Sequence, residues 1–117
     1  MPESQSLDIF NQTEALENVG GSAELLLDLS QTLIEELPKL LSAAQQAITS
    51  GNAATASRSL HSIKGSVTPF AAKTSYDIAW EMEQAAAAGD LNGASDRLAD
   101  LELELQRLVA AMKSANL

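Results

Sequence analysis

Apolar side chains recur every three or four residues along most of this 117-residue chain, which is the spacing of one face of an α-helix. The pattern is longest near the C-terminus, where it continues over about six turns. The residues of that stripe are Leu91, Ala94, Leu98, Leu101, Leu105, Leu108 and Met112. No segment shows the alternation of apolar and polar residues that a half-buried strand needs. The spacing therefore predicts an all-α fold.

A second long stripe lies nearer the N-terminus and contains a proline. Ser22 has the side chain of a helix N-cap, and Gly51 is the residue type that most often follows a helix end. The apolar residues between them are Leu26, Leu29, Leu33, Leu37, Leu40, Ala44 and Ile48. Pro38 lies inside this stripe, so we predict one long helix kinked there or two nearly continuous helices.

Two shorter helices are predicted between these stripes. Asn52 opens the first, and Pro69 stops it near Thr68 because proline disfavours helical geometry in the residue before it. The second runs from about Thr74 to Ala88. Asp90 is then predicted to cap the C-terminal helix.

Near the N-terminus, Asn11 or Thr13 is predicted to cap a short helix that runs to Val19 and ends at Gly20–Gly21. Four substantial helices joined by short turns favour an antiparallel, up-down four-helix bundle, to which this short helix is an addition. A chain of this length is large enough for one hydrophobic core. We therefore predict a single domain over residues 1–117.

The charge and composition of the chain exclude several kinds of partner and site. Its net charge of −9 would repel the phosphates of a nucleic acid, and without cysteine it forms neither disulfides nor thiolate metal sites. No apolar run approaches the roughly 18 residues of a membrane span. The segment Met1–Ser4 lacks the basic and apolar regions of a signal peptide. We predict a monomeric, soluble, cytoplasmic protein that binds neither nucleic acid nor membranes.

Aromatic residues make up only 3% of the chain, so the core is expected to consist mainly of Leu, Ala and Ile. The larger residues Phe70, Tyr76, Trp80 and Met82 are expected in that core or at its rim. No cofactor is inferred from them.

His61 is the only histidine, and its neighbours along the predicted helix are unusual. It lies at the margin of the apolar stripe, with Lys64 three residues and Gly65 four residues further on. Helical side chains lean toward the N-terminus, so any side chain at position 65 would project over His61. Glycine inside a helix costs about 0.5–1 kcal/mol relative to alanine, which indicates that this site needs the open space. The pattern favours a nucleophilic imidazole that accepts a phosphoryl group.

Positive charge surrounds this histidine. The segment from Ser42 to Tyr76 contains no acidic residue, and all 16 acids lie before or after it. Its basic residues are Arg58, Lys64 and Lys73. An ammonium group at Lys64 would stabilise the charge of an incoming phosphoryl group, and the basic segment predicts a face for an acidic partner. The predicted partner-binding residues are Ser57, Arg58, Thr68 and Lys73.

The run His61-Ser62-Ile63-Lys64-Gly65-Ser66 resembles the signature of the histidine-containing phosphotransfer (HPt) domain of multistep two-component phosphorelays. The similarity extends over nearly the whole chain. The other similar segments are Val19-Gly20-Gly21-Ser22, Leu37-Pro38, Ser50-Gly51-Asn52 and Ala88-Gly89-Asp90-Leu91. The helical order of these segments makes the resemblance more specific than the six-residue motif alone.

The resemblance implies a phosphoryl carrier without ATP-dependent kinase activity of its own. A receiver domain's phospho-aspartate would give its phosphoryl group to a ring nitrogen of His61, which would pass it to the aspartate of another receiver. The domain itself would bind neither ATP nor metal, because the partner receiver supplies Mg²⁺. Its partners would be the receiver domains of response regulators, a hybrid sensor histidine kinase, or both.

Two residues depart from the family's pattern. Members usually have glycine in the turn after the histidine helix, where Ala71 stands here, so this turn is expected to differ locally. Some members have a glutamine on the following helix that supports the histidine. The matching place here holds Glu83, with Gln84 next to it, and the sequence leaves open which of them supports His61.

Other interpretations stay open on the sequence. A lone histidine beside an apolar stripe is more often a packing residue than a nucleophile. The chain could also be a non-catalytic helical adaptor, in which His61 happens to be exposed and the partner recognises shape alone. His61 could instead be a general base, although the sequence offers no carboxylate near it to orient the ring and no second nucleophile. The chain could also be the substrate domain of a chemotaxis-type kinase, although no dimerisation or catalytic domain accompanies it in this sequence.

Overall fold

The structure is a computed structural model that describes residues 7–116. Its α-helices are α2 (Gln12–Asn18), α3 (Ala23–Thr49), α4 (Ala53–Val67), α5 (Lys73–Ala87) and α6 (Ala94–Ser114), and a short 3₁₀ helix, η1 (Thr68–Phe70), follows α4. The described residues contain no β-strand, so the predicted all-α class is confirmed.

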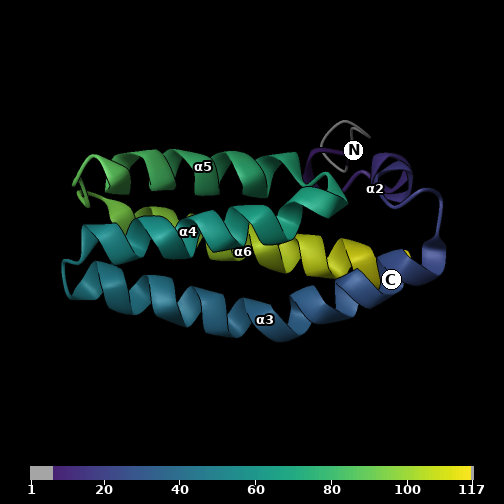
Figure 1. Ribbon diagram of the computed structural model, residues 1–117, viewed down its shortest axis with the longest axis horizontal. Helices are drawn as coiled ribbons and strands as arrows, with labels where there is room; N and C mark the ends of the chain where they lie inside the picture. The colour runs from purple at the N-terminus through teal and green to yellow at the C-terminus, as the bar shows by residue number, and fades with distance from the viewer. Residues whose placement is uncertain (1–6, 117) are drawn as a thin grey trace.

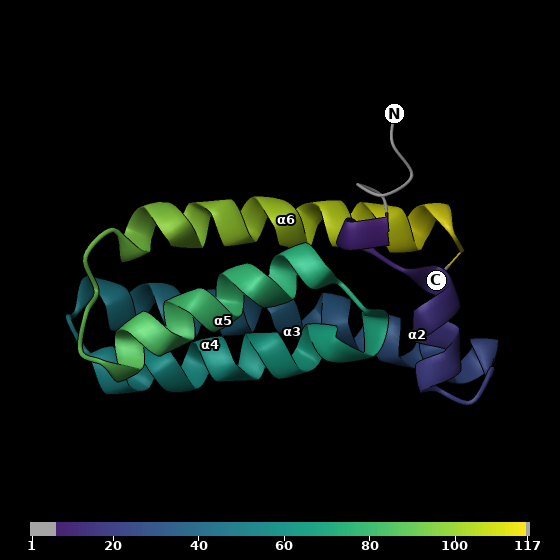
Figure 2. The ribbon, with the colours of Figure 1, turned by 90° about the horizontal axis from the view of Figure 1, so that it is seen from above.

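Helices α3 to α6 lie side by side along the long axis of the molecule, and each runs antiparallel to the one before it (Figure 1). Because α4 packs against α3 and α5, and α6 packs against α5 and α3, the four helices close into a bundle. Helix α2 lies across one end of the bundle, beside η1 (Figure 2). This is the predicted up-down four-helix bundle with an additional N-terminal helix.

Side-chain caps fix where three of the helices begin. In each, a side-chain oxygen accepts a hydrogen bond of 3.1 Å from a backbone N–H three residues later: Asn11 from Glu14, Ser22 from Leu25, and Asn52 from Thr55. Such a cap satisfies a donor that has no partner within the helix and is worth about 1 kcal/mol. The predicted caps at Ser22 and Asn52 are confirmed, and Asn11 rather than Thr13 caps the short N-terminal helix.

The buried side chains form one apolar core along the bundle. The stripe on α6 is buried as its spacing predicts, through Leu98, Leu101, Leu105, Leu108 and Met112. Phe70 and Met82 lie in the core, whereas Tyr76 and Trp80 are exposed on α5. The core therefore holds α4 and α5 together, and the rings of Tyr76 and Trp80 lie outside it.

Helix α3 is a single helix from Ala23 to Thr49 that curves along its length (Figure 1). Pro38 lies inside it on an exposed position. Proline removes one backbone donor, and long helices curve or bend at such a position. Of the two predicted alternatives, the structure has the one long helix.

The start of α6 differs from the prediction. The helix begins at Ala94 because Gly93, with a φ of 72°, takes a left-handed conformation immediately before it, and glycine adopts this conformation without steric cost. Asp90 lies earlier, in the preceding turn, where its Oδ1 accepts a hydrogen bond of 2.9 Å from the N–H of Asn92. The prediction that Asp90 caps the last helix is wrong.

The turn between α4 and α5 contains an alanine in a glycine-like conformation. Ala71 has a φ of 52° and a ψ of 43°, in the left-handed region. The methyl group of alanine makes this region cost roughly 1–2 kcal/mol. Ala71 thus adopts a conformation that glycine takes without steric cost, and the turn carries some backbone strain.

Candidate functional site

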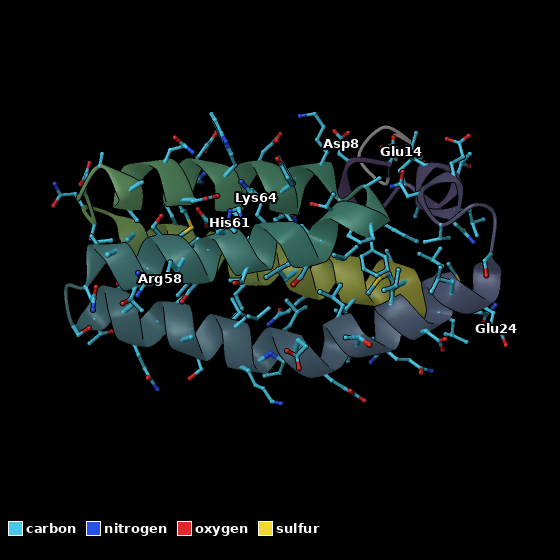
Figure 3. The ribbon with its side chains drawn as sticks, in the orientation of Figure 1. Asp8, Glu14, Glu24, Arg58, His61 and Lys64 are labelled. Carbon is cyan, nitrogen blue, oxygen red and sulfur yellow. The ribbon has the colours of Figure 1, made fainter. Side chains whose placement is uncertain are left out.

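His61 lies on the surface of α4, on the side of that helix that faces α5 (Figure 3). Its side chain is 67% exposed, so another molecule can reach the ring. Leu60 and Ile63 beside it in the sequence are buried and anchor this part of α4 in the core. The histidine is therefore at the margin of the apolar stripe, as predicted.

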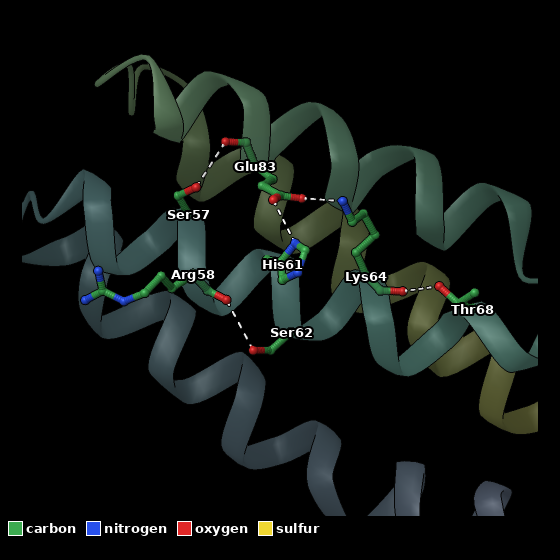
Figure 4. Close-up of polar contacts among 7 residues, drawn as sticks. All are labelled: Ser57, Arg58, His61, Ser62, Lys64, Thr68 and Glu83. Atoms are coloured by element: carbon green, nitrogen blue, oxygen red, sulfur yellow. Dashed lines mark hydrogen bonds and ion pairs between the residues drawn. The ribbon is translucent and has the colours of Figure 1, made fainter.

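One edge of the imidazole ring contacts α5 through Glu83. Nδ1 of His61 lies 2.9 Å from Oε2 of Glu83, whose side chain is only 14% exposed (Figure 4). An ionised carboxylate can only accept hydrogen bonds, so Nδ1 carries the proton and donates it. The lone pair of the neutral ring then lies on Nε2, which has no hydrogen-bond partner among the described residues.

This contact corrects one argument made from the sequence. A carboxylate does orient His61, although no acidic residue lies near it along the chain. The antiparallel pairing of α4 and α5 brings Glu83 there from the neighbouring helix. Counting residues from the connecting turn does not separate Glu83 from Gln84, so only the packing of α4 on α5 identifies Glu83 as the neighbour of His61.

Lys64 binds the other oxygen of the same carboxylate. Its Nζ lies 2.8 Å from Oε1 of Glu83, and it also lies 5.8 Å from the centre of the Tyr76 ring. Glu83 thus links the histidine to the lysine across the gap between α4 and α5 (Figure 4). The structure places these three residues together, two of them from the predicted motif and one from outside it.

Lys64 and Glu83 stabilise each other's charged forms. Partial burial alone would raise the pKa of Glu83, but the hydrogen bonds and charges of Lys64 and His61 outweigh burial and lower this pKa below its ordinary value. In turn, the hydrogen bond to Glu83 raises the pKa of Lys64 against the opposing effect of burial. Both groups therefore remain ionised around neutral pH, and the carboxylate stays a hydrogen-bond acceptor for His61.

Gly65 leaves open space one helical turn after His61. A Cβ atom built on Gly65 would meet no atom outside its own helix within 4 Å. The absence of a side chain is therefore not needed for packing inside the molecule. The space at this position faces solvent and is available to an approaching partner.

The four residues predicted to bind a partner have different neighbours in the structure, and Lys73 lies at the start of α5, about ten residues along that helix from Glu83. The Ser57 hydroxyl is 3.5 Å from the Glu83 carbonyl oxygen, and Thr68 donates a hydrogen bond of 2.9 Å to the carbonyl of Lys64. Arg58 donates a hydrogen bond of 3.2 Å to the Thr55 hydroxyl. No carboxylate of the described residues lies within ion-pair distance of Arg58. Lys73 pairs with Asp77 at 2.6 Å.

These contacts change the charge expected for the face. The predicted segment carries three cations and no acid, but α5 supplies the carboxylates of Asp77 and Glu83 from just beyond it. Including these two carboxylates reduces the formal charge from +3 to +1. The sequence segment is basic, whereas the folded surface is nearly balanced.

Two further observations describe what surrounds the site. The His61 side chain is 67% exposed, so the ring lies on an open part of the surface. Within residues 7–116, no three His, Cys, Asp or Glu side chains gather as a metal ion would require, and no helix is both long and apolar enough to cross a membrane.

Comparison with known proteins assigns this geometry to a family. The sequence model of the Hpt domain matches residues 28–111, which include the whole of α4 and α5. The chain belongs to the Hpt domain family. Domains of this family carry phosphoryl groups in two-component phosphorelays.

A solved Hpt domain has the same fold. It is the crystal structure of the HPT domain of an Hpt sensor hybrid histidine kinase from Shewanella, and it aligns with a TM-score of 0.80. The alignment covers 93% of this chain and 94% of that domain at 21% sequence identity, a level that supports the fold alone. No curated protein matches the sequence.

Proposed function

We propose that this Hpt domain accepts a phosphoryl group on Nε2 of His61 from the phospho-aspartate of one receiver domain and passes it to the aspartate of another. The observation that carries this proposal is the hydrogen bond from Nδ1 to Glu83, because it directs the lone pair to the ring nitrogen that faces solvent. An exposed nucleophile on an open helix face suits a donor that is itself a folded domain.

The transfer balances with the groups that the site provides. Nε2 attacks phosphorus, an N–P bond forms, and the P–O bond of the acyl phosphate breaks with its electron pair leaving on the receiver's carboxylate. Nδ1 keeps its proton, so the product is a phosphoimidazolium whose positive charge the Glu83 carboxylate balances. The second transfer is the reverse of these steps toward a different aspartate. Glu83 acts in both as a positioning residue.

Lys64 and Gly65 have separate roles in this scheme. Lys64 keeps two N–H donors beyond the one that it directs to Glu83, and these stabilise the phosphoryl oxygens as the group arrives. Gly65 keeps the approach to the ring clear. Contacts from Ser57, Arg58, Thr68 and Lys73 would orient the receiver.

The domain would act as a carrier and not as a kinase. Receiver domains, either separate or within a hybrid sensor histidine kinase, are the partners, and the receiver brings the Mg²⁺ for the transfer. No step requires ATP on this chain, because the phospho-aspartate already supplies an activated phosphoryl group.

The test is a transfer assay with purified proteins. Receiver domains encoded in the same genome are charged with acetyl phosphate and mixed with the wild-type domain, and label stable to alkali but labile to acid is expected on His61. His61→Gln should keep its helical circular dichroism and acquire no such label. The proposal would be contradicted if the variant were labelled at the wild-type rate. It would also be contradicted if no receiver labelled the wild type, a result that would favour a helical adaptor.

A further inference from the structure

Two large aromatic side chains lie exposed beside the histidine site. Tyr76 is 36% exposed and Trp80 is 47% exposed, one helical turn apart on α5. Residues at spacings of four and three lie on one side of a helix, so Tyr76, Trp80 and Glu83 form a single row. Tyr76 contacts Lys64 at one end of this row, and Glu83 contacts His61 at the other. Trp80 therefore lies between two residues that belong to the site.

A folded phosphoryl donor must cover this row. Attack requires the donor's phosphorus to come within about 3–3.5 Å of Nε2. A folded receiver that brings its phospho-aspartate so close places the surrounding surface over residues within a turn of His61 and Glu83. Trp80, three residues before Glu83, falls inside that area.

Charge contributes less to this contact than the sequence predicts. Lys64 and Lys73 already pair with carboxylates of α5, and the formal charge of the face is only +1. Attraction between exposed charges is also screened by salt. Tyrosine and tryptophan, by contrast, bury large areas and are over-represented among the residues that dominate interface affinity.

From these observations we propose that Tyr76 and Trp80 form an aromatic docking patch for the receiver domain that exchanges phosphoryl groups with His61, and that Trp80 supplies a major part of the affinity. The patch fits a receiver with an apolar surface beside its phospho-aspartate. This inference rests on the proposed function, because it names the part of the domain that recognises the same partner.

The test separates docking from chemistry. The receiver that labels the wild-type domain fastest is used with Trp80→Ala and with Leu103→Ala, a matched control that removes a 48% exposed side chain from the outer face of α6. Trp80→Ala should raise the receiver KM about tenfold or more with a small change in maximum rate, and Leu103→Ala should change neither. The wild-type KM should rise less than about threefold between low and high salt.

A small donor provides the second measurement. Phosphoramidate phosphorylates imidazoles without any protein partner, so Trp80→Ala should be labelled by it at close to the wild-type rate. Thermal unfolding of each variant confirms that the comparison is between folded proteins. Loss of phosphoramidate labelling in folded Trp80→Ala would place Trp80 in the chemistry and overturn its assignment to docking.

The remaining outcomes are distinct. A receiver KM that is unchanged in Trp80→Ala, or raised equally in Leu103→Ala, overturns the docking patch while the phosphotransfer function stands. A wild-type dimer in sedimentation that Trp80→Ala dissociates would show that the row binds a second copy instead. If no receiver labels the wild type, the proposed function fails, and the receiver patch fails with it.

Discussion

At the residue scale, Glu83 decides which nitrogen of His61 is left without a proton for the proposed transfer. A carboxylate accepts hydrogen bonds only, whereas the amide of glutamine can accept or donate. A glutamate at this place therefore holds the ring with its proton on Nδ1, and the ion pair with Lys64 keeps the glutamate charged. The histidine motif depends for its reactive tautomer on a residue that lies outside the motif.

Glu83→Gln tests this dependence. The amide can still accept the Nδ1 hydrogen bond but cannot balance the charge of the phosphoimidazolium, so receiver-to-His61 transfer should slow about tenfold, equivalent to about 1.4 kcal/mol. Rapid-quench labelling at saturating receiver measures this rate. An unchanged rate would show that the carboxylate charge has no part in the transfer.

The same variant should also change how the free energy of unfolding depends on pH. The folded-state pKa of Glu83 is below its ordinary value of 4.5, so its contribution is fully present above that pH and is lost as pH falls through the folded-state pKa. Urea unfolding should therefore show wild type more stable than Glu83→Gln at pH 7, with the difference shrinking toward pH 3. A difference that stays constant over this range would contradict the lowered pKa.

At the scale of the element, α4 combines a packing face with the face that carries His61, on which the transfer is proposed to occur. Its buried residues are Ala56, Leu60, Ile63 and Val67, and they fix the helix in the bundle. Gly65 lies on the other face, where it has helical geometry and no packing partner for a Cβ. Local stability and function therefore make opposite demands on this one position.

Substitutions at Gly65 should separate the two demands. Gly65→Ala should raise the free energy of unfolding by up to about 1 kcal/mol, because alanine is the better helix former and its methyl group meets nothing. Gly65→Gln should keep the helix but place its side chain over His61 and slow receiver transfer more than alanine does. Thermal unfolding and transfer rates measured on both variants check this, and full transfer activity in Gly65→Gln would remove the steric role of the glycine.

At the scale of the whole molecule, the parts that the sequence predicted are those set by local spacing. The stripes of α3 and α6 and the caps at Ser22 and Asn52 depend on neighbours within one or two turns. The contact between Glu83 and His61 depends instead on the register of two antiparallel helices. The same register pairs Lys64 with Glu83, whereas Lys73 pairs with Asp77 within α5.

Other differences come from conformation and exposure. Asp90 and Gly93 both suit a helix start, and only the backbone geometry of the turn shows that the helix begins after the glycine. Apolar spacing places Tyr76 and Trp80 near the core boundary but does not say which side of it they occupy. Their exposure depends on how closely α4 covers that flank of α5.

The turn that joins α4 to α5 carries the strain of a left-handed alanine. Ala71→Gly should relieve that strain and stabilise the whole bundle by about 0.5–1 kcal/mol. The gain is smaller than the full strain because glycine also increases the conformational entropy of the unfolded chain. Ala72→Gly is the matched control, because Ala72 is buried and has a φ of −87°, which is not strained for alanine. This substitution should lower the stability of the protein. Urea unfolding followed by circular dichroism gives both values. Destabilisation by Ala71→Gly would mean that the turn tolerates alanine without strain.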